Sequence, residues 1–282
     1  MPQEAGHTPA AEDLLSQLEK VLSGCGRLAV ACSGGADSTL LASAAVKLMG
    51  RENVLLLHVK SCFSPDRESD FFETWTAASD LQTKIIHADP LGIPEITRND
   101  ARRCYHCKKF IFSRLLQEAE ELGFAVLADG TNLDDFNDYR PGLEASAELG
   151  IGHPLAEAGF GKREIRILAK HLGLANWNAP AAACLASRIP CDTALDEKSL
   201  ALVSSAEDFL CGLGFPECRV RKLGTLAKIE VGTHHLAILW EKRETVNERL
   251  RTLGFKSVAI DLAGYQQGAM NNLICKPSGL DS

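Results

Sequence analysis

The chain has 282 residues, of which 45% are hydrophobic and 24% are charged, and it carries a formal net charge of −7 at pH 7. Such a composition is typical of a globular protein with a sizeable core, arranged as one large domain or two ordinary ones. The acidic balance argues against a large nucleic-acid-binding surface. No apolar run approaches the ~18 residues of a membrane span, and the opening residues lack the apolar core of a signal peptide. We therefore expect a cytoplasmic protein with no membrane or nucleic-acid partner, whose residues 1–13 form a frayed tail.

After this tail, helical and strand patterns alternate. Apolar residues on one helical face are followed by short continuous apolar runs, each typical of a buried parallel strand. The predicted elements are helix 14–22, strand 28–31, helix 40–49, strand 54–59, helix 66–81 and strand 84–88. Their order predicts an α/β fold with a doubly wound parallel sheet, in which ligands bind at the carboxyl ends of the strands.

The link between the first strand and its helix has the sequence Ser33-Gly34-Gly35-Ala36-Asp37-Ser38. Two glycines let the backbone turn tightly and approach a ligand, and the N–H groups of a helix N-terminus suit an anion such as phosphate. No Gly-Lys-Ser/Thr follows, so the loop is not a Walker A motif. The motif resembles the pyrophosphate loop of the ATP pyrophosphatases, which cleave ATP to AMP and pyrophosphate. The alternative is an ordinary glycine-rich turn.

Ser33, Gly34, Gly35, Asp37 and Ser38 are the predicted ATP-binding residues of this loop. The carboxylate of Asp37 would repel a phosphate, so we expect it to bind a Mg²⁺ ion that bridges the pyrophosphate. A helix N-cap is the alternative role for this aspartate. Release of pyrophosphate implies that a substrate oxygen attacks the α-phosphate and becomes activated as an adenylate.

Two cysteines, Cys104 and Cys107, open the next predicted helix, which follows a basic segment at 98–103. Their spacing places both thiols within reach of one metal or cluster, and the neighbouring cations favour thiolates. In a chain with ten cysteines and no secretory signal, such thiols indicate metal binding or catalysis rather than disulfides. Zinc lacks an obvious second pair of ligands, and a redox dithiol lacks the thioredoxin context. The remaining option is an iron–sulfur cluster with three protein ligands.

The third ligand is expected from the proline-bounded segment 176–190, which lacks periodicity and is predicted to be a functional loop. Cys184 in this loop is the first choice, and Cys191 is the second. The other six cysteines have no partner pattern and are expected to be packing residues: Cys25, Cys32, Cys62, Cys211, Cys218 and Cys275.

From about residue 195 the pattern changes to a smaller α/β unit. Before this point, strand 125–128 and helix 164–172 complete the predicted elements of the first region. After it, the predicted elements are helix 196–213, strands 218–221 and 227–231, helix 233–253 and strand 257–262. We therefore expect an ATP-binding domain over 14–194 and a small substrate-binding or oligomerisation domain over 195–282, in a protein that forms a homo-oligomer.

Arg219 and Arg221 alternate on one of these predicted strands, so both side chains point to the same face. Two guanidinium groups on one face suit a phosphate, which they bind through bidentate hydrogen bonds. The alternative is a solvated strand whose arginines make surface salt bridges.

Several motifs occur in one order along residues 14–275, and together they are specific. They are the loop 33–38, Arg103-Cys104-Tyr105-His106-Cys107-Lys108, Asp138-Tyr139-Arg140-Pro141-Gly142-Leu143, Leu172-Gly173-Leu174 with Trp177-Asn178, Ser187-Arg188-Ile189-Pro190, and Gly214-Phe215-Pro216 with Arg219-Val220-Arg221. This set resembles the LarE family, the ATP-dependent sulfur transferases of nickel-pincer cofactor synthesis that serve lactate racemase. The resemblance implies that ATP adenylates a carboxylate of pyridinium-3,5-biscarboxylic acid mononucleotide, that sulfur replaces the activated oxygen, and that AMP leaves. Two rounds would give the bisthiocarboxylate.

Two sources of sulfur occur within that family. In one branch a loop cysteine gives up its own sulfur and becomes dehydroalanine, and in the other three cysteines hold a 4Fe–4S cluster whose open iron carries an extra sulfide. The resemblance places the sacrificial position at Ala183, so Cys104, Cys107 and Cys184 imply the cluster branch, with Cys184 both a ligand and catalytic. Many relatives have Ile-Pro-Tyr-Gly where this chain has Ile189-Pro190-Cys191-Asp192, which keeps Cys191 open as an alternative ligand.

The resemblance also implies roles for polar residues around the two sites. Ser187 and a catalytic Arg188 would lie near AMP or the substrate, Asp138 and Arg140 would line the ATP site, and Glu207, Arg219 and Arg221 would contact the substrate. Two other functions stay open. One is a tRNA thiolase, which also combines this loop with a three-cysteine cluster, and the other is a regulatory protein that senses ATP or an iron–sulfur cluster without catalysis.

Overall fold

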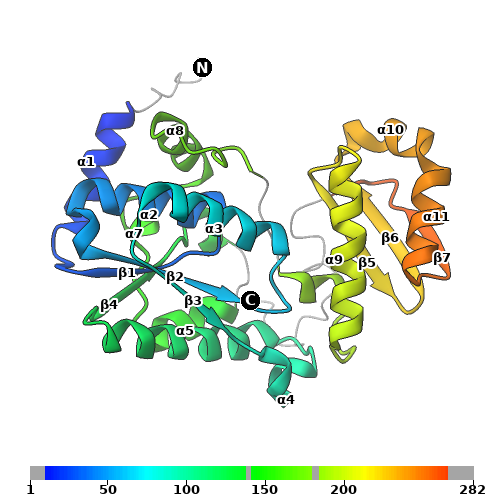
Figure 1. The fold of residues 1–282 in the computed structure, drawn as a ribbon, viewed down its shortest axis with the longest axis horizontal. Helices are drawn as coiled ribbons and strands as arrows, with labels where there is room; N and C mark the ends of the chain where they lie inside the picture. The colour runs from blue at the N-terminus through cyan, green and yellow to red at the C-terminus, as the bar shows by residue number, and fades with distance from the viewer. Residues whose placement is uncertain (1–9, 138–140, 180–183, 266–282) are drawn as a thin grey trace, which may run out of the picture. The chain divides into compact units, whose positions relative to one another are not determined.

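A computed structural model describes residues 10–137, 141–179 and 184–265, which form two compact units (Figure 1). Neither unit is continuous in sequence. The first contains the described residues up to 60 together with 67–88 and 108–179, and the second contains 61–66, 89–107 and 184–265. Within the described ranges, no helix combines the length and the apolar character that crossing a bilayer requires.

The first unit is built on a four-stranded parallel sheet with the strand order β3-β2-β1-β4. Its strands are β1 (Leu28–Ala31), β2 (Val54–Lys60), β3 (Thr83–His87) and β4 (Val126–Asp129). Ala31 at the end of β1 pairs with Leu57 of β2 and Asp129 of β4, so the carboxyl ends of these strands lie at one edge. The predicted doubly wound parallel sheet is confirmed.

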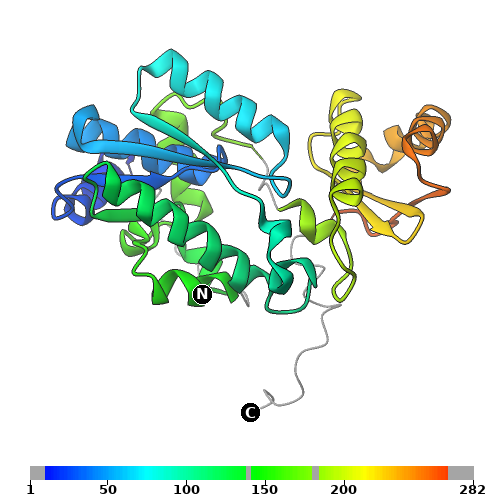
Figure 2. The same ribbon diagram turned by 60° about the horizontal axis from the view of Figure 1, so that its bottom comes forward.

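Helices cover both faces of this sheet (Figure 1). They are α1 (Ala11–Leu22), α2 (Ala36–Met49), α3 (Asp66–Ser79), α5 (Arg103–Glu121), α6 (Pro141–Glu148), α7 (Pro154–Glu157) and α8 (Lys162–His171), with the 3-10 turns η1 (Arg51–Asn53) and η3 (Leu133–Asn137). Leu28 and Val30 of β1 pack in one core with α1, α2 and α8, whereas Ala29 packs with α5, which lies in front of the sheet in Figure 2. Because alternate strand residues point to opposite faces, one apolar run contributes to two cores.

The helices α6 and α7 lie between residues 128 and 164, where no helix or strand is predicted from the sequence. Each begins with a proline, Pro141 or Pro154. Proline is favoured at the first helical position, because its missing N–H would have no intrahelical partner there. The helix predicted from residue 40 also begins earlier, at Ala36, so Asp37 belongs to the first turn of α2.

The second unit contains a three-stranded sheet with the order β5-β6-β7, in which β6 is antiparallel to β5 and parallel to β7. Its elements are β5 (Cys218–Leu223), β6 (Leu226–Val231), β7 (Ser257–Ile260), α4 (Pro94–Thr97), α9 (Glu197–Gly212), α10 (Leu236–Glu241), α11 (Arg243–Leu253), η2 (Pro90–Gly92), η4 (Leu185–Arg188) and η5 (Thr233–His235). The prediction of a single helix over 233–253 is wrong, because the structure has two helices there. Lys242, with ψ of 8°, interrupts the helical path between α10 and α11, and Leu239 and Val246 are buried on either side of it.

The segment 184–195 belongs to this second unit through backbone hydrogen bonds. The N–H of Asp192 donates to the carbonyl of Asn99 at 3.0 Å, and that of Leu195 donates to the carbonyl of Thr97 at 2.8 Å. These bonds connect residues that are about a hundred positions apart. The division between the two units therefore does not coincide with the domain boundary expected between residues 194 and 195.

Candidate active site

The predicted nucleotide loop follows β1 directly. Gly34 has φ of +88°, and a Cβ atom at this position would lie 2.5 Å from the carbonyl oxygen of Glu68, so only glycine fits. Gly35 is the N-cap of α2, and the first N–H groups of a helix have no intrahelical acceptor. The loop thus combines a glycine turn with a helix N-terminus at the carboxyl end of a parallel strand, the arrangement that suits phosphate.

Hydroxyl groups hold this loop in shape. Ser38 Oγ accepts the N–H of Ser33 at 3.2 Å and donates to the carbonyl of Gly35 at 3.2 Å. Ser33 Oγ lies 3.2 Å from Ser38 Oγ and accepts the N–H of Gly35 at 3.3 Å. Ser38 is buried whereas Ser33 is exposed. The buried hydroxyl therefore supports the turn, and the exposed one remains at its surface.

Asp37 meets a lysine from a distant part of the sequence. Its Oδ2 atom accepts a hydrogen bond from the ammonium group of Lys162, the first residue of α8, and lies 3.4 Å from Nδ2 of Asn132. The N–H of Lys162 donates to Asp134 Oδ2 at 2.8 Å, which fixes the start of α8 at this place. The alternative role of Asp37 as the N-cap is wrong, because Gly35 occupies that position. A cation faces the carboxylate that we expect to bind Mg²⁺.

Two further segments pack against the loop. Asn176 donates from Nδ2 to the carbonyl of Gly34 at 3.1 Å and to Thr39 Oγ1 at 3.2 Å. Gly130, which follows β4, approaches so closely that a Cβ atom on it would lie 2.6 Å from the backbone nitrogen of Ser38. The loop is therefore enclosed by chain segments that the sequence places far apart.

Asp129 ends β4 at the same edge of the sheet. Its burial would raise the pKa of the carboxyl, but the hydrogen bond with Nδ1 of His153 at 2.8 Å and the charge of Lys108 at 3.8 Å outweigh burial and lower the pKa to about 2. The N–H of Thr131 also donates to Asp129 Oδ1 at 3.0 Å. Asp129 is therefore an ionised anchor for the turn that follows β4.

In the second unit, the predicted cluster ligands gather around one guanidinium. Nη2 of Arg103, the first residue of α5, lies 3.2 Å from Cys104 Sγ. Burial lowers the pKa of Arg103, but the charges of Cys104, Cys184 and Cys107 more than offset this effect and raise it. Three thiols around a cation have the chemistry of an iron–sulfur donor set. Among the described residues, no three His, Cys, Asp or Glu side chains lie close enough to share a single metal ion.

Two more cysteines belong to this neighbourhood. Burial and the adjacent Asp192 raise the pKa of Cys191, while the charge of Arg103 acts to lower it. Burial raises the pKa of Cys62 to about 11, with smaller contributions from Asp89, Glu197 and, least of all, Cys184. Cys62 is therefore a neutral thiol beside the segment that carries Cys184. Within the described part of the chain, no two cysteines are joined by a disulfide.

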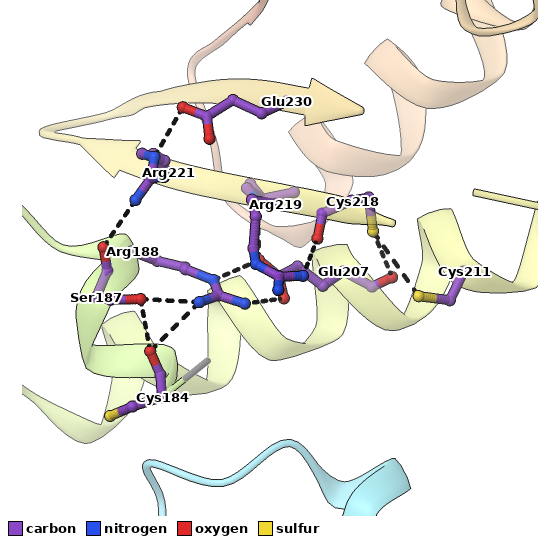
Figure 3. A network of polar contacts seen from close by, with 10 residues as sticks. Cys184, Ser187, Arg188, Glu207, Cys211, Cys218, Arg219, Arg221 and Glu230 are labelled. Carbon is purple, nitrogen blue, oxygen red and sulfur yellow. Dashed lines mark hydrogen bonds and ion pairs between the residues drawn. The ribbon is translucent and has the colours of Figure 1, made fainter. Parts of the chain in front are cut away.

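Arg188 and Glu207 form a buried ion pair that supports the Cys184 segment (Figure 3). Nε and Nη2 of Arg188 donate to Glu207 Oε1 and Oε2 at 2.7 and 3.0 Å, and both residues are 1% exposed. Nη1 of Arg188 donates to Ser187 Oγ at 2.8 Å, and this hydroxyl donates to the carbonyl of Cys184 at 2.7 Å. These are the contacts of a residue that holds a loop. The catalytic role of Arg188 and the substrate contact of Glu207 stay predictions.

Arg219 and Arg221 leave β5 on the same face, as their alternation predicts (Figure 3). Arg221 donates from Nε to Glu230 Oε1 at 2.7 Å and from Nη1 to the carbonyl of Ser187 at 3.0 Å. Arg219 donates to the carbonyl of Cys218 at 2.8 Å, and its guanidinium lies 4.9 Å from the ring centroid of Tyr265. The alternative of a solvated strand is wrong, because Arg219 is 3% and Arg221 is 7% exposed.

Glu230 is an ionised acceptor shared by two cations. Its burial would raise the pKa, but hydrogen bonds from Arg221 and Lys228 lower it. Lys228 Nζ lies 2.8 Å from Glu230 Oε1 and 2.8 Å from Asp261 Oδ2. The position of Arg221 is thus fixed by a network that spans the small sheet.

The sequence-based site residues divide between the two units. The residues of loop 33–38 lie in the first, and Cys104, Cys107, Cys184, Ser187, Arg188, Glu207, Arg219 and Arg221 lie in the second. Asp138 and Arg140 lie outside the described residues. Sequence reasoning gave Arg103 a role only as one of the cations that favour thiolates. It missed the other polar residues that support these sites, which are Asn99, Asp129, Asn132, His153, Lys162 and Asn176. The position of residues 129–132 just after a predicted strand was an available signal, whereas nothing in the sequence distinguishes Asn99 or Asn176.

Known proteins align with nearly the whole chain. It is 38% identical over 252 residues to the pyridinium-3,5-bisthiocarboxylic acid mononucleotide synthase of Lactiplantibacillus plantarum, with 89% of this chain and 91% of that protein covered. It is 33% identical over 268 residues to an uncharacterised protein of Synechocystis. This alignment covers 94% of this chain and 99% of that protein. An uncharacterised protein of Methanocaldococcus jannaschii is 32% identical over 248 residues. This alignment covers 85% of this chain and 91% of that protein. No family model matches the chain.

Proposed function

Because this chain belongs to the LarE family of pyridinium-3,5-bisthiocarboxylic acid mononucleotide synthases, it is an enzyme, and we propose that it is an ATP-dependent sulfur transferase acting on pyridinium-3,5-biscarboxylic acid mononucleotide. A carboxylate does not exchange oxygen for sulfur without activation, since its charge repels a nucleophile and its oxygen leaves poorly. The observation that carries the proposal is the glycine loop before α2, with the Asp37–Lys162 pair beside it.

The proposed reaction has two steps for each carboxylate. A carboxylate oxygen attacks the α-phosphorus of ATP, the bond to the β-phosphate oxygen breaks, and pyrophosphate leaves. A sulfur nucleophile then attacks the carbonyl carbon of the adenylate, and AMP leaves with the former carboxylate oxygen. Repetition at the second carboxylate gives the bisthiocarboxylate, with two ATP molecules consumed.

In this account the loop residues bind the part of ATP that becomes pyrophosphate. The N–H groups of Ser33 to Ser38 would donate to the phosphate oxygens, and Asp37 would hold Mg²⁺. Mg²⁺ and the ammonium of Lys162 compete for the same carboxylate, so binding of Mg·ATP would move Lys162 from Asp37 to a phosphate oxygen. Lys162 thereby keeps Asp37 charge-balanced before the nucleotide arrives.

We assign sulfur delivery to Cys104, Cys107 and Cys184. When bound by these thiolates, a 4Fe–4S cluster would supply an open iron that carries a sulfide from an external donor. The support is the arrangement of all three thiols around Arg103. Cys191 is the alternative ligand, because it lies near the same cation. The sacrificial route, in which Cys184 gives up its own sulfur, is the competing chemistry.

Arg219 and Arg221 are the proposed binding residues for the phosphate of the pyridinium mononucleotide. Their guanidinium groups lie on one face of β5, and Arg221 is already oriented by Glu230. A phosphate would compete with the carbonyl oxygens of Ser187 and Cys218, which are weaker acceptors than a dianion. Ser187 would then link the phosphate site to the segment that carries Cys184.

Release of pyrophosphate tests the first step. The purified protein is mixed with Mg²⁺ and ATP, with and without the biscarboxylate mononucleotide, and pyrophosphate is measured. We expect release only when this substrate is present. Release without it, or release that tRNA stimulates instead, would contradict the proposal.

A further inference from the structure

We propose that Asn99 and Arg103 are the positioning residues of the sulfur-delivery site. This inference rests on the proposed function. Together the two residues hold the segment 184–193 against the first turn of α5, and they present one cation to the anionic sulfur centre that Cys104, Cys107 and Cys184 bind.

Asn99 holds one side of this arrangement. It is 1% exposed and has φ of +59°, in the left-handed region that few residues other than glycine adopt. Its Nδ2 atom donates to the carbonyls of Pro190 at 2.8 Å and Thr193 at 3.0 Å, and its own carbonyl accepts the N–H of Asp192 at 3.0 Å. Asparagine suits this position because its amide both donates and accepts and because it tolerates the left-handed conformation.

Arg103 completes the connection. Its Nη1 atom donates to Oδ1 of Asn99 at 2.6 Å and to the carbonyl of Ala186 at 3.1 Å, while Nη2 lies 3.2 Å from Cys104 Sγ. One guanidinium therefore contacts Asn99, the turn η4 that follows Cys184, and a cysteine of α5. The two side chains form a continuous polar link between the cysteine-bearing segments.

The placement of this charge is not explained by the stability of α5. Arg103 is the first residue of a 19-residue helix, where the positive end of the helix dipole disfavours a cation. Its Nη2 atom instead lies 3.2 Å from Cys104 Sγ, one of the three proposed ligands. A cluster bound by thiolates is anionic, and a nearby cation stabilises its more negative, reduced form. Arg103 would thus both orient the ligand segments and raise the reduction potential of the centre.

Hydrogen–deuterium exchange of the iron-free protein tests the positioning role without any cluster. Asn99→Gly accommodates the positive φ but removes the amide, and Arg103→Gln removes the guanidinium. Arg98→Gln, at an exposed position on the same segment, is the matched control. Because each variant removes hydrogen bonds that hold this segment, we expect exchange in 184–193 to rise about tenfold in both. Exchange that stays at the wild-type value in both would overturn the proposal, as would an equal rise in β5 and β6.

Anaerobic reconstitution tests the role of the charge. Arg103→Lys keeps a cation but cannot reach Asn99 and Ala186 with one planar group, whereas Arg103→Gln removes the charge. We expect both variants to lose iron to a chelator faster than the wild type, and only Arg103→Gln to lower the reduction potential. Equal potentials in the two variants would contradict the electrostatic part. If the wild type bound no iron, the proposed cluster would fail, while the exchange experiment would still decide the positioning role.

Discussion

The nucleotide loop and the cysteine segment are stabilised in different ways. Residues 33–38 are contiguous, and most of their contacts join groups only a few positions apart. Segment 184–193 is held by side chains from elsewhere in the chain, namely the buried Asn99, the partly buried Arg103, and Glu207 through Arg188. A site whose contacts run between near neighbours in the chain appears in the sequence as one motif, whereas a site held by distant side chains also depends on single residues, such as Asn99, that no motif marks. Variants at the two sites should therefore separate adenylation from sulfur delivery.

The largest expected effect is the loss of multiple turnover in Cys104→Ala. Removal of one of three proposed ligands should abolish iron binding after anaerobic reconstitution and leave no more than one product per chain, as measured by iron analysis and product quantification. Adenylation by the nucleotide loop should persist, because that loop makes its own contacts. Cys25→Ala is the control.

Retention of both iron and multiple turnover in Cys104→Ala would contradict the cluster. Mass spectrometry of the wild type after one turnover gives an independent answer. Dehydroalanine at residue 184 would establish the sacrificial route instead.

Asp37→Asn should affect the other site. Without the carboxylate, Mg²⁺ loses its protein ligand, and we expect substrate-dependent pyrophosphate release to fall about a thousandfold. Iron content should match that of the wild type. Asp80→Asn, in the exposed Arg51–Asp80 pair, serves as the matched control. A parallel loss of iron in Asp37→Asn would show that the two sites are not independent.

Glu207→Ala should destabilise the support of the cysteine segment. It leaves the buried Arg188 guanidinium without its carboxylate, which costs about 3–5 kcal/mol in the free energy of unfolding measured by urea titration. The exposed Asp80→Asn control should change the same quantity by less than about 1 kcal/mol. Similar values for the two variants would mean that the Arg188–Glu207 pair does not stabilise the second unit.

The smallest expected effect is the pH dependence of the unfolding free energy that Asp129 contributes in the first unit. The pKa of Asp129 is lowered from 3.8 to about 2 in the folded protein, so its contribution to stability is complete above pH 3.8 and is lost as the pH falls through 2. The difference in unfolding free energy between the wild type and Asp129→Asn should therefore shrink by about 2 kcal/mol over this interval. A difference that is independent of pH between 4 and 2 would contradict the contacts of Asp129 with His153 and Lys108.

Sequence reasoning predicted those features that depend on neighbours along the chain. The apolar runs at 28–31 and 54–59 gave strands because each is continuous and bounded by turns, and Gly34 identified the loop because a side chain there would meet Glu68. The same reasoning predicted no helix at 141–148 or 154–157, where each helix begins at a proline, a residue that favours both loops and the first turn of a helix. Lys242 also carries no breaker signal.

The supporting residues could not be predicted, because their roles arise from long-range contacts. Lys162 reaches Asp37 across 125 positions, and Asn99 reaches Pro190 across 91. Neither residue differs in type or spacing from an ordinary surface residue. Cys62, expected to be a packing residue, lies close enough to Cys184 for that cysteine to make a small contribution to its pKa, in a turn that the sequence does not distinguish.

Mass spectrometry of a single anaerobic reaction tests the central claim most directly. The reconstituted protein is supplied with ATP, Mg²⁺, sulfide and pyridinium-3,5-biscarboxylic acid mononucleotide, and both the small molecules and the protein are analysed. We predict AMP, pyrophosphate and the bisthiocarboxylate in several-fold excess over protein, with the mass of the polypeptide unchanged. The absence of a thiocarboxylate product alongside an intact, iron-containing protein would contradict the account.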